Sequence, residues 1–303
     1  MQSLSMFNKL IAVLAASLIL ATAQAQTAPA QPLKPNQNPL MTTPRPLFFQ
    51  DIVALDTSLH RTLTLPLQRT SFAFAGQANV LPLTFAEVGQ ALHHYPVVFV
   101  ADGNAVSLVA LTDLQPGSNR FVNAKGEWRA GAYIPAYVRG YPFISIRVAD
   151  KAEPLLALDP QAADFKAPDG QKLLLADGQP SELLKGIMAF QGEYRQLAER
   201  THAMVQALQD ANVLEEGSLQ LQPTAGGEPQ KIGGFMVVSE SKLKALPADA
   251  LKKLMDADAL GLAYAQMFSM GSLSNVFAQP MQDTEPSMAP VKAASKRAAK
   301  KAQ

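Results

Sequence analysis

The chain has 303 residues, of which 48% are hydrophobic and 17% are charged, and its formal net charge is +1. This apolar content excludes a wholly disordered chain, since such chains are poor in hydrophobic residues. The lack of cysteine excludes disulfides, thiolate metal sites and cysteine nucleophiles. The near-neutral charge argues against a protein that coats nucleic acid, so we expect no nucleic-acid partner.

Residues 1–25 have the pattern of a secretory signal peptide. Lys9 precedes an uncharged run of 14 residues, 10–23, and Ala23-Gln24-Ala25 offers a small-x-small cleavage site. The alternatives are a buried N-terminal helix and an uncleaved membrane anchor, but the run is shorter than the ~20 residues of a typical membrane span. We therefore expect an exported protein of the periplasm or the cell surface.

Two polar segments flank the region that we expect to fold as a single domain, residues 47–278. Residues 26–46 contain six prolines in 21 positions, which is typical of an extended linker. Residues 279–303 hold five basic and two acidic residues and predict a disordered basic tail. This tail either only solubilises the chain or binds anionic lipid or polysaccharide.

The N-terminal half of the domain is expected to be mainly antiparallel sheet, because its turns follow one another too closely for crossover helices. Thr84 and Glu87 fit a capping box for a short helix that ends near His94. The segments with strand patterns, separated by turn signals such as Asp102-Gly103-Asn104 and Lys125-Gly126, are 96–101, 106–111, 120–122, 127–128, 133–138, 142–148 and 172–175.

After Pro180 the apolar spacing changes to that of helices. Ser181 is placed to cap an amphipathic helix of about 30 residues, with Gly192 as the position for a bend. A further hairpin is expected over 218–222 and 230–238, and helices are expected from Pro247 and over 260–277. The predicted fold class is α+β, with the long helix and the C-terminal helices packed on the sheet.

Aromatic side chains cluster between Trp128 and Phe143, and they include Tyr133, Tyr137 and Tyr141. On alternating strand positions these rings can line an amphipathic groove for a peptide or a sugar. The alternative is that they belong to the core and the edge of a sheet. The neighbouring arginines, which can clamp a carboxylate or form surface salt bridges, are Arg129, Arg139 and Arg147.

The histidines do not define a metal site. His93 and His94 are adjacent on a helix and point about 100° apart, so they cannot readily share one ion. We include His94 among the candidate binding residues, whereas His202 is distant in the sequence. No catalytic residue, metal ligand or cofactor is assigned. Gln266 lies in an apolar helix and needs hydrogen-bond partners if it is buried.

An ordered set of motifs resembles the SapC family, which is named after a surface-layer-associated protein of a pathogenic bacterium. These motifs are His94-Tyr95-Pro96-Val97-Val98-Phe99, residues 128–137, Tyr141-Pro142-Phe143-Ile144, Leu158-Asp159, Gly234-Phe235 and Tyr264-x-Gln266-x-x-Ser269-x-x-Ser272-Leu273. The resemblance implies association with a paracrystalline surface layer or, in other lineages, with outer-membrane receptors and tryptophan halogenases. A transporter permease shares the name, but it needs several membrane-spanning helices that this sequence does not predict.

The leading hypothesis is an exported SapC-like protein with a non-enzymatic binding or surface-assembly role at the cell envelope. Its expected partner is an envelope protein or a surface-layer component. The aromatic segment, with Arg139 and His94, and the basic tail are its candidate contact surfaces. The alternative is an envelope enzyme or enzyme accessory that acts on peptides or aromatic compounds, which would need His94 or His202 against a carboxylate in a pocket.

Overall fold

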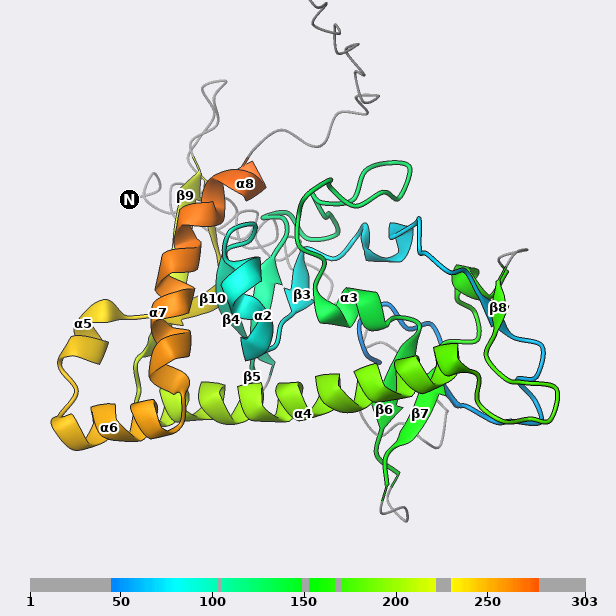
Figure 1. The fold of residues 1–303 in the computed structure, drawn as a ribbon. Coiled ribbons are helices and arrows are strands. Elements are labelled where there is room, and N and C mark those ends of the chain that lie inside the picture. Colours follow the sequence, from blue (N-terminus) through cyan, green and yellow to red (C-terminus); the bar gives the residue numbers. More distant parts are fainter. Residues whose placement is uncertain (1–44, 103–104, 149–152, 167–169, 222–229, 278–303) are drawn as a thin grey trace, which may run out of the picture. The chain divides into compact units, whose positions relative to one another are not determined.

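In the described part of the chain the strands form three antiparallel sheets, and helices are interspersed with them along the sequence (Figure 1). The computed structural model describes residues 45–102, 105–148, 153–166, 170–221 and 230–277. The expected signal peptide, nearly all of the linker and the basic tail lie outside these residues. Separate antiparallel sheets and helices confirm the predicted α+β class.

The largest sheet has five strands in the order β3-β5-β4-β10-β9 among the described residues. Their bounds in that order are Val80–Pro82, Ala105–Leu111, Val97–Asp102, Gln230–Val238 and Leu214–Leu221. The two predicted hairpins, β4–β5 and β9–β10, are confirmed. Their tips, residues 103–104 and 222–229, lie outside the described residues.

Two smaller sheets join parts of the chain that are distant in sequence. In the first, β7 (Leu155–Leu158) lies between β1 (Val53–Ala54) and β6 (Phe143–Ile146). In the second, β2 (Thr64–Leu65) pairs with β8 (Gln171–Lys172). The predicted strand over 142–148 is therefore confirmed as the shorter β6, and only the first residue of the predicted strand over 172–175 lies in β8.

The longest helix of the described chain is α4, which runs without interruption from Glu182 to Asp210, through Gly192. Ser181 caps it, as predicted, because its hydroxyl accepts a hydrogen bond of 3.3 Å from the amide of Leu184. The other helices, in chain order from α2 to α8 without α4, are Phe85–Ala91, Ala136–Gly140, Glu240–Lys244, Ala248–Asp256, Ala259–Ser269 and Leu273–Phe277. None of the helices described has both the length and the hydropathy of a membrane span.

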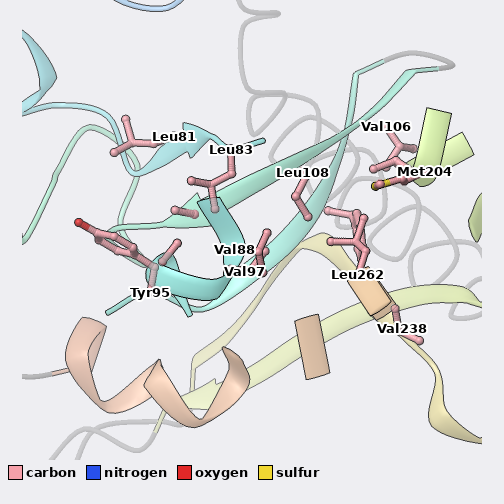
Figure 2. Close-up of a cluster of buried hydrophobic side chains, with 14 of the residues drawn as sticks. Leu81, Leu83, Val88, Tyr95, Val97, Val106, Leu108, Met204, Val238 and Leu262 are labelled. Carbon is pink, nitrogen blue, oxygen red and sulfur yellow. The ribbon is translucent and has the colours of Figure 1, made fainter. Parts of the chain in front are cut away.

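The main hydrophobic core lies between the large sheet and helices α2, α4 and α7. Figure 2 shows Val88 of α2, Val97 of β4, Met204 of α4 and Leu262 of α7 within one cluster of buried side chains. Because α4 also contacts α3 and β6, one helix connects this core to the smaller sheet that contains β6 and β7 (Figure 1).

The prediction of a strand over 133–138 is wrong. Residues 133–135 form a loop, and α3 begins directly after it, with Pro135 at the N-cap position. Proline has no amide hydrogen for a sheet ladder, and its fixed φ suits the start of a helix. The amide of Ala136 donates to the side chain of Glu87 and not to a neighbouring strand.

Gln266 is fully buried in α7, and it has the hydrogen-bond partners that its position requires. Its Oε1 accepts from the amide of Val238 at 2.9 Å, and its Nε2 donates to the carbonyl of Val97 at 3.2 Å. One side chain thus fastens α7 to the neighbouring strands β10 and β4.

We predict that Gln266→Met lowers the free energy of unfolding by about 2 kcal/mol, because the amide of Val238 loses its acceptor in a buried place. Urea unfolding followed by far-UV circular dichroism measures this change. The matched control is Gln206→Met, at an exposed position of α4, where less than about 0.5 kcal/mol is expected. Equal losses in the two variants would contradict the assignment.

Candidate functional site

A cleft of about 580 Å³ lies between the first turns of α4 and the segment that joins α3 to β6. Residues near β2 and the 3₁₀ helix Ala163–Lys166 complete its wall. Its lining is mainly apolar, and the carbon-rich side chains include Leu65, Phe72, Phe143, Leu183, Ile187 and Phe190. This size and composition are typical of a site for a small organic ligand.

The first turns of α4 contribute an apolar face to the cleft, and Leu183 and Ile187 on this face also pack against a buried cluster that contains Leu184. Leu183, Gly186, Ile187 and Phe190 are spaced three and four residues apart, so they lie along one side of the helix. A Cβ atom built on Gly186 meets no heavy atom within 4 Å. The glycine therefore leaves open space in the middle of this face.

Arg69 forms one wall of the cleft, and its guanidinium is engaged with the protein. Its Nη2 lies 2.9 Å from Asp164 Oδ2, its Nη1 donates to the carbonyl of Val138 at 3.0 Å, and Nη2 also donates to the carbonyl of Tyr141. The side chain is only 16% exposed. Arg69 thus holds the segment between α3 and β6 in place.

Arg139 is the exposed cation of the cleft. Its Nε donates to the carbonyl of Ile134 at 3.1 Å, and its Nη2 donates to the Tyr133 hydroxyl at 3.3 Å. The guanidinium carbon lies 5.4 Å from the centre of the Phe190 ring. These bonds use two of its five N–H groups, and the others have no acceptor among the described residues.

The position of Tyr133 depends on Glu87, whose carboxylate is buried. Glu87 accepts from the Tyr133 hydroxyl at 3.1 Å, from the amide of Ala136, and from the amide and the hydroxyl of Thr84 at 2.9 and 2.8 Å. The predicted capping box of α2 is confirmed. Burial and the nearby charge of Glu87 raise the pKa of Tyr133, which keeps its hydroxyl protonated as a donor.

Tyr137 and Tyr141 tie the N-terminal end of the described chain to this region. The Tyr137 hydroxyl donates to the carbonyl of Leu47 at 2.9 Å, and the Tyr141 hydroxyl donates to Asp159 Oδ2 at 3.2 Å. Burial raises the pKa of both tyrosines, and for Tyr141 the charge of Asp159 adds to the effect. Both hydroxyls therefore act as hydrogen-bond donors within the fold.

Trp128 and His94 lie elsewhere. Trp128 is buried in the main core, where its ring meets that of Phe72 with the centroids 5.5 Å apart. His94 is half-buried just beyond α2, and burial, assisted by the charge of His93, lowers its pKa. Neither residue lines the cleft.

Of the six candidate binding residues, the structure thus brings Arg139 and Tyr141 to the cleft. Tyr133 accepts a hydrogen bond from Arg139 but does not line the cavity. The other three candidates, which also do not line it, are Trp128, Tyr137 and His94. The lining residues Arg69, Asp164, Leu183 and Phe190 were not among the candidates from the sequence. A signal for Leu183 was present, because it lies beside Leu184 and Ile187 on the apolar stripe of the predicted helix.

The other arginines have structural contacts. The guanidinium of Arg129 lies 4.2 Å from the centre of the Phe121 ring and donates to the carbonyl of Arg120 at 2.9 Å. Arg147 forms an exposed ion pair of 3.1 Å with Glu199, which is the surface salt bridge expected as one of two uses for these arginines. Within the described ranges, no group of three or more His, Asp or Glu residues is arranged to hold a metal ion.

Comparison with known proteins agrees with the motifs quoted above. Residues 55–276 match the model of the SapC family, and this chain belongs to that family. The comparison with curated proteins and the comparison with solved structures gave no match.

We predict that Glu87→Gln lowers the free energy of unfolding by about 2–3 kcal/mol. The side-chain NH₂ group of glutamine would face the backbone N–H of Thr84 or of Ala136, so two donors would meet. The backbone N–H groups are fixed by the fold and cannot reorient. Urea unfolding measures the loss. The control is Glu199→Gln, an exposed partner of Arg147 and Arg195, for which less than about 1 kcal/mol is expected. A loss at position 87 no larger than the control would refute the role of Glu87.

Proposed function

We propose that this SapC-family protein is an exported, non-enzymatic binding protein of the cell envelope. The observation that carries the proposal is the apolar cleft beside α4, which has an arginine with unused hydrogen-bond donors at its margin. This combination suits the capture of an apolar ligand with one polar end.

The state of the ionisable groups in the cleft supports binding over catalysis. Asp164 is paired with Arg69 at 2.9 Å, and both side chains are largely buried. General acid–base catalysis requires a group that is free to exchange a proton with the substrate. His94 and His202, on which the enzymatic alternative rests, do not line this cleft.

Export and attachment are supported by the sequence on either side of the domain. The pattern of residues 1–25 directs secretion, with cleavage before Gln26. The five basic residues of the tail then offer a contact to anionic lipid or polysaccharide. An envelope protein or a surface-layer component is the proposed macromolecular partner.

Cell fractionation with mass spectrometry of the recovered chain tests the proposal. In the producing bacterium, we expect the protein in the periplasmic or envelope fraction with Gln26 as its first residue. A variant with glutamine in place of Lys292, Lys296, Arg297, Lys300 and Lys301 is expected to leave the envelope fraction at low salt, with an unchanged free energy of unfolding.

Two results would contradict the proposal separately. An intact chain that begins at Met1 in the cytosol would overturn export. Equal retention of the wild type and the neutral-tail variant at low salt would overturn the role of the tail, because electrostatic attachment is strongest where screening is weakest.

A further inference from the structure

We propose that the cleft beside α4 binds a long-chain carboxylate, that is, a single carboxylate on an extended hydrocarbon body. This inference rests on the proposed binding function and names the class of its ligand. Three features of the described residues support it: the shape of the apolar face, the engagement of the polar groups in the wall, and the available cation at one end.

The apolar face is elongated. From Glu182 to Phe190 the helix α4 rises about 12 Å, and along this length Leu183, Gly186 and Ile187 all face the cleft. Phe143 and Leu65 face it from other elements. A long, narrow body gains more contact here than a compact one.

Several polar groups of the wall already form hydrogen bonds or ion pairs within the protein. They therefore offer few free donors or acceptors to the middle of a ligand. Gln191 Nε2 donates to the carbonyls of Gly140 and Phe143 at 3.1 and 2.8 Å, and Arg69 and Asp164 bind each other. A peptide in the cleft would have to leave backbone N–H and C=O groups without partners, which costs free energy. A hydrocarbon chain needs no such partners, so the wall favours it over a peptide.

The available charge at one end of the cleft sets the polarity of the ligand. Arg139 stands over Phe190 at one end with free N–H groups, and a planar guanidinium can hold a carboxylate through two parallel hydrogen bonds. Glu182, one turn before Gly186, stands at the other end, where it pairs with Lys185 at 2.8 Å. The charge that is available to a ligand is therefore the guanidinium of Arg139.

Gly186 provides the space for the hydrocarbon chain. The position is exposed, and open space surrounds its missing Cβ. A side chain at this position would begin without a clash at its Cβ atom, and further atoms would occupy space in the cleft that Gly186 lines. Leucine also has a higher helix propensity than glycine, so this substitution is expected to block the cleft while the helix gains stability.

Isothermal titration calorimetry of the chain from Gln26 to Gln303 tests the inference. The three probes share one alkyl chain and are each used below the concentration at which they aggregate: dodecanoate, dodecanol and dodecyltrimethylammonium. We expect dodecanoate to bind most tightly. Arg139→Gln is expected to weaken dodecanoate by about tenfold or more, as for the loss of a charge-assisted pair, and to leave dodecanol unchanged.

Matched variants separate the cleft from general effects. Arg147→Gln removes an exposed arginine of the neighbouring segment that is paired with Glu199, and it is expected to bind dodecanoate like the wild type. Gly186→Leu is expected to lose binding of all three probes with no fall in melting temperature. Gly89→Leu, at an exposed helical glycine of α2 with open space around it, is expected to retain binding.

Each contrary result removes a different part of the inference. Equal dodecanoate affinity in wild type and Arg139→Gln would overturn the head-group assignment. Undiminished binding by Gly186→Leu would overturn the location. A wild-type chain that binds none of the probes would overturn the ligand class, whereas export and attachment through the tail are tested separately by the fractionation results.

Discussion

The buried carboxylate of Glu87 is the interaction on which the arrangement of the cleft depends. Burying a carboxylate costs several kcal/mol unless hydrogen bonds replace its hydration. Here Thr84, Tyr133 and Ala136 provide four donors. The same group therefore starts α2, places the first amide of α3 and orients the Tyr133 hydroxyl, which in turn accepts from Arg139. A capping residue of one helix thus determines where the exposed cation of the cleft stands.

The helix α4 carries this arrangement across the molecule. The Thr201 hydroxyl accepts from the amide of Phe85 at 2.8 Å, so α4 is fastened to the first turn of α2. Ten residues earlier on the same helix, Gln191 binds the carbonyls of Gly140 and Phe143. Because one helix makes both connections, the positions of the main core and of the cleft are linked through a single element.

The sequence allowed the local parts of the fold to be predicted, and the reason is physical. A capping box, a two-strand hairpin and an amphipathic helix are each determined by residues close together in the chain, as at Thr84 and Ser181. The short strands were missed because their partners are remote: Val53 pairs with Leu158, and Thr64 pairs with Lys172. Two residues are too few to show an alternating pattern. The strand expected over 133–138 failed because Pro135 and the distant Glu87 outweigh local alternation.

The candidate site was predictable only in part for the same reason. Arg139 and Tyr141 were selected because aromatic and basic residues are dense around them in the sequence. The rest of the lining includes Arg69, Asp164 and the first turns of α4, and only the fold brings these segments together. Membership of the SapC family agrees with the motifs but specifies no ligand, so the chemistry of the cleft follows from its own residues.

A double-mutant cycle in dodecanoate affinity tests the central claim most directly, namely that Glu87 positions Arg139 through Tyr133. The variants are Tyr133→Phe, Arg139→Gln and their combination, each in the full chain. The account predicts that removing the Tyr133 hydroxyl weakens binding several-fold while Arg139 is present and has no effect once Arg139 is replaced. The same effect of Tyr133→Phe in both backgrounds would show that the hydroxyl does not act through Arg139, and would contradict the account.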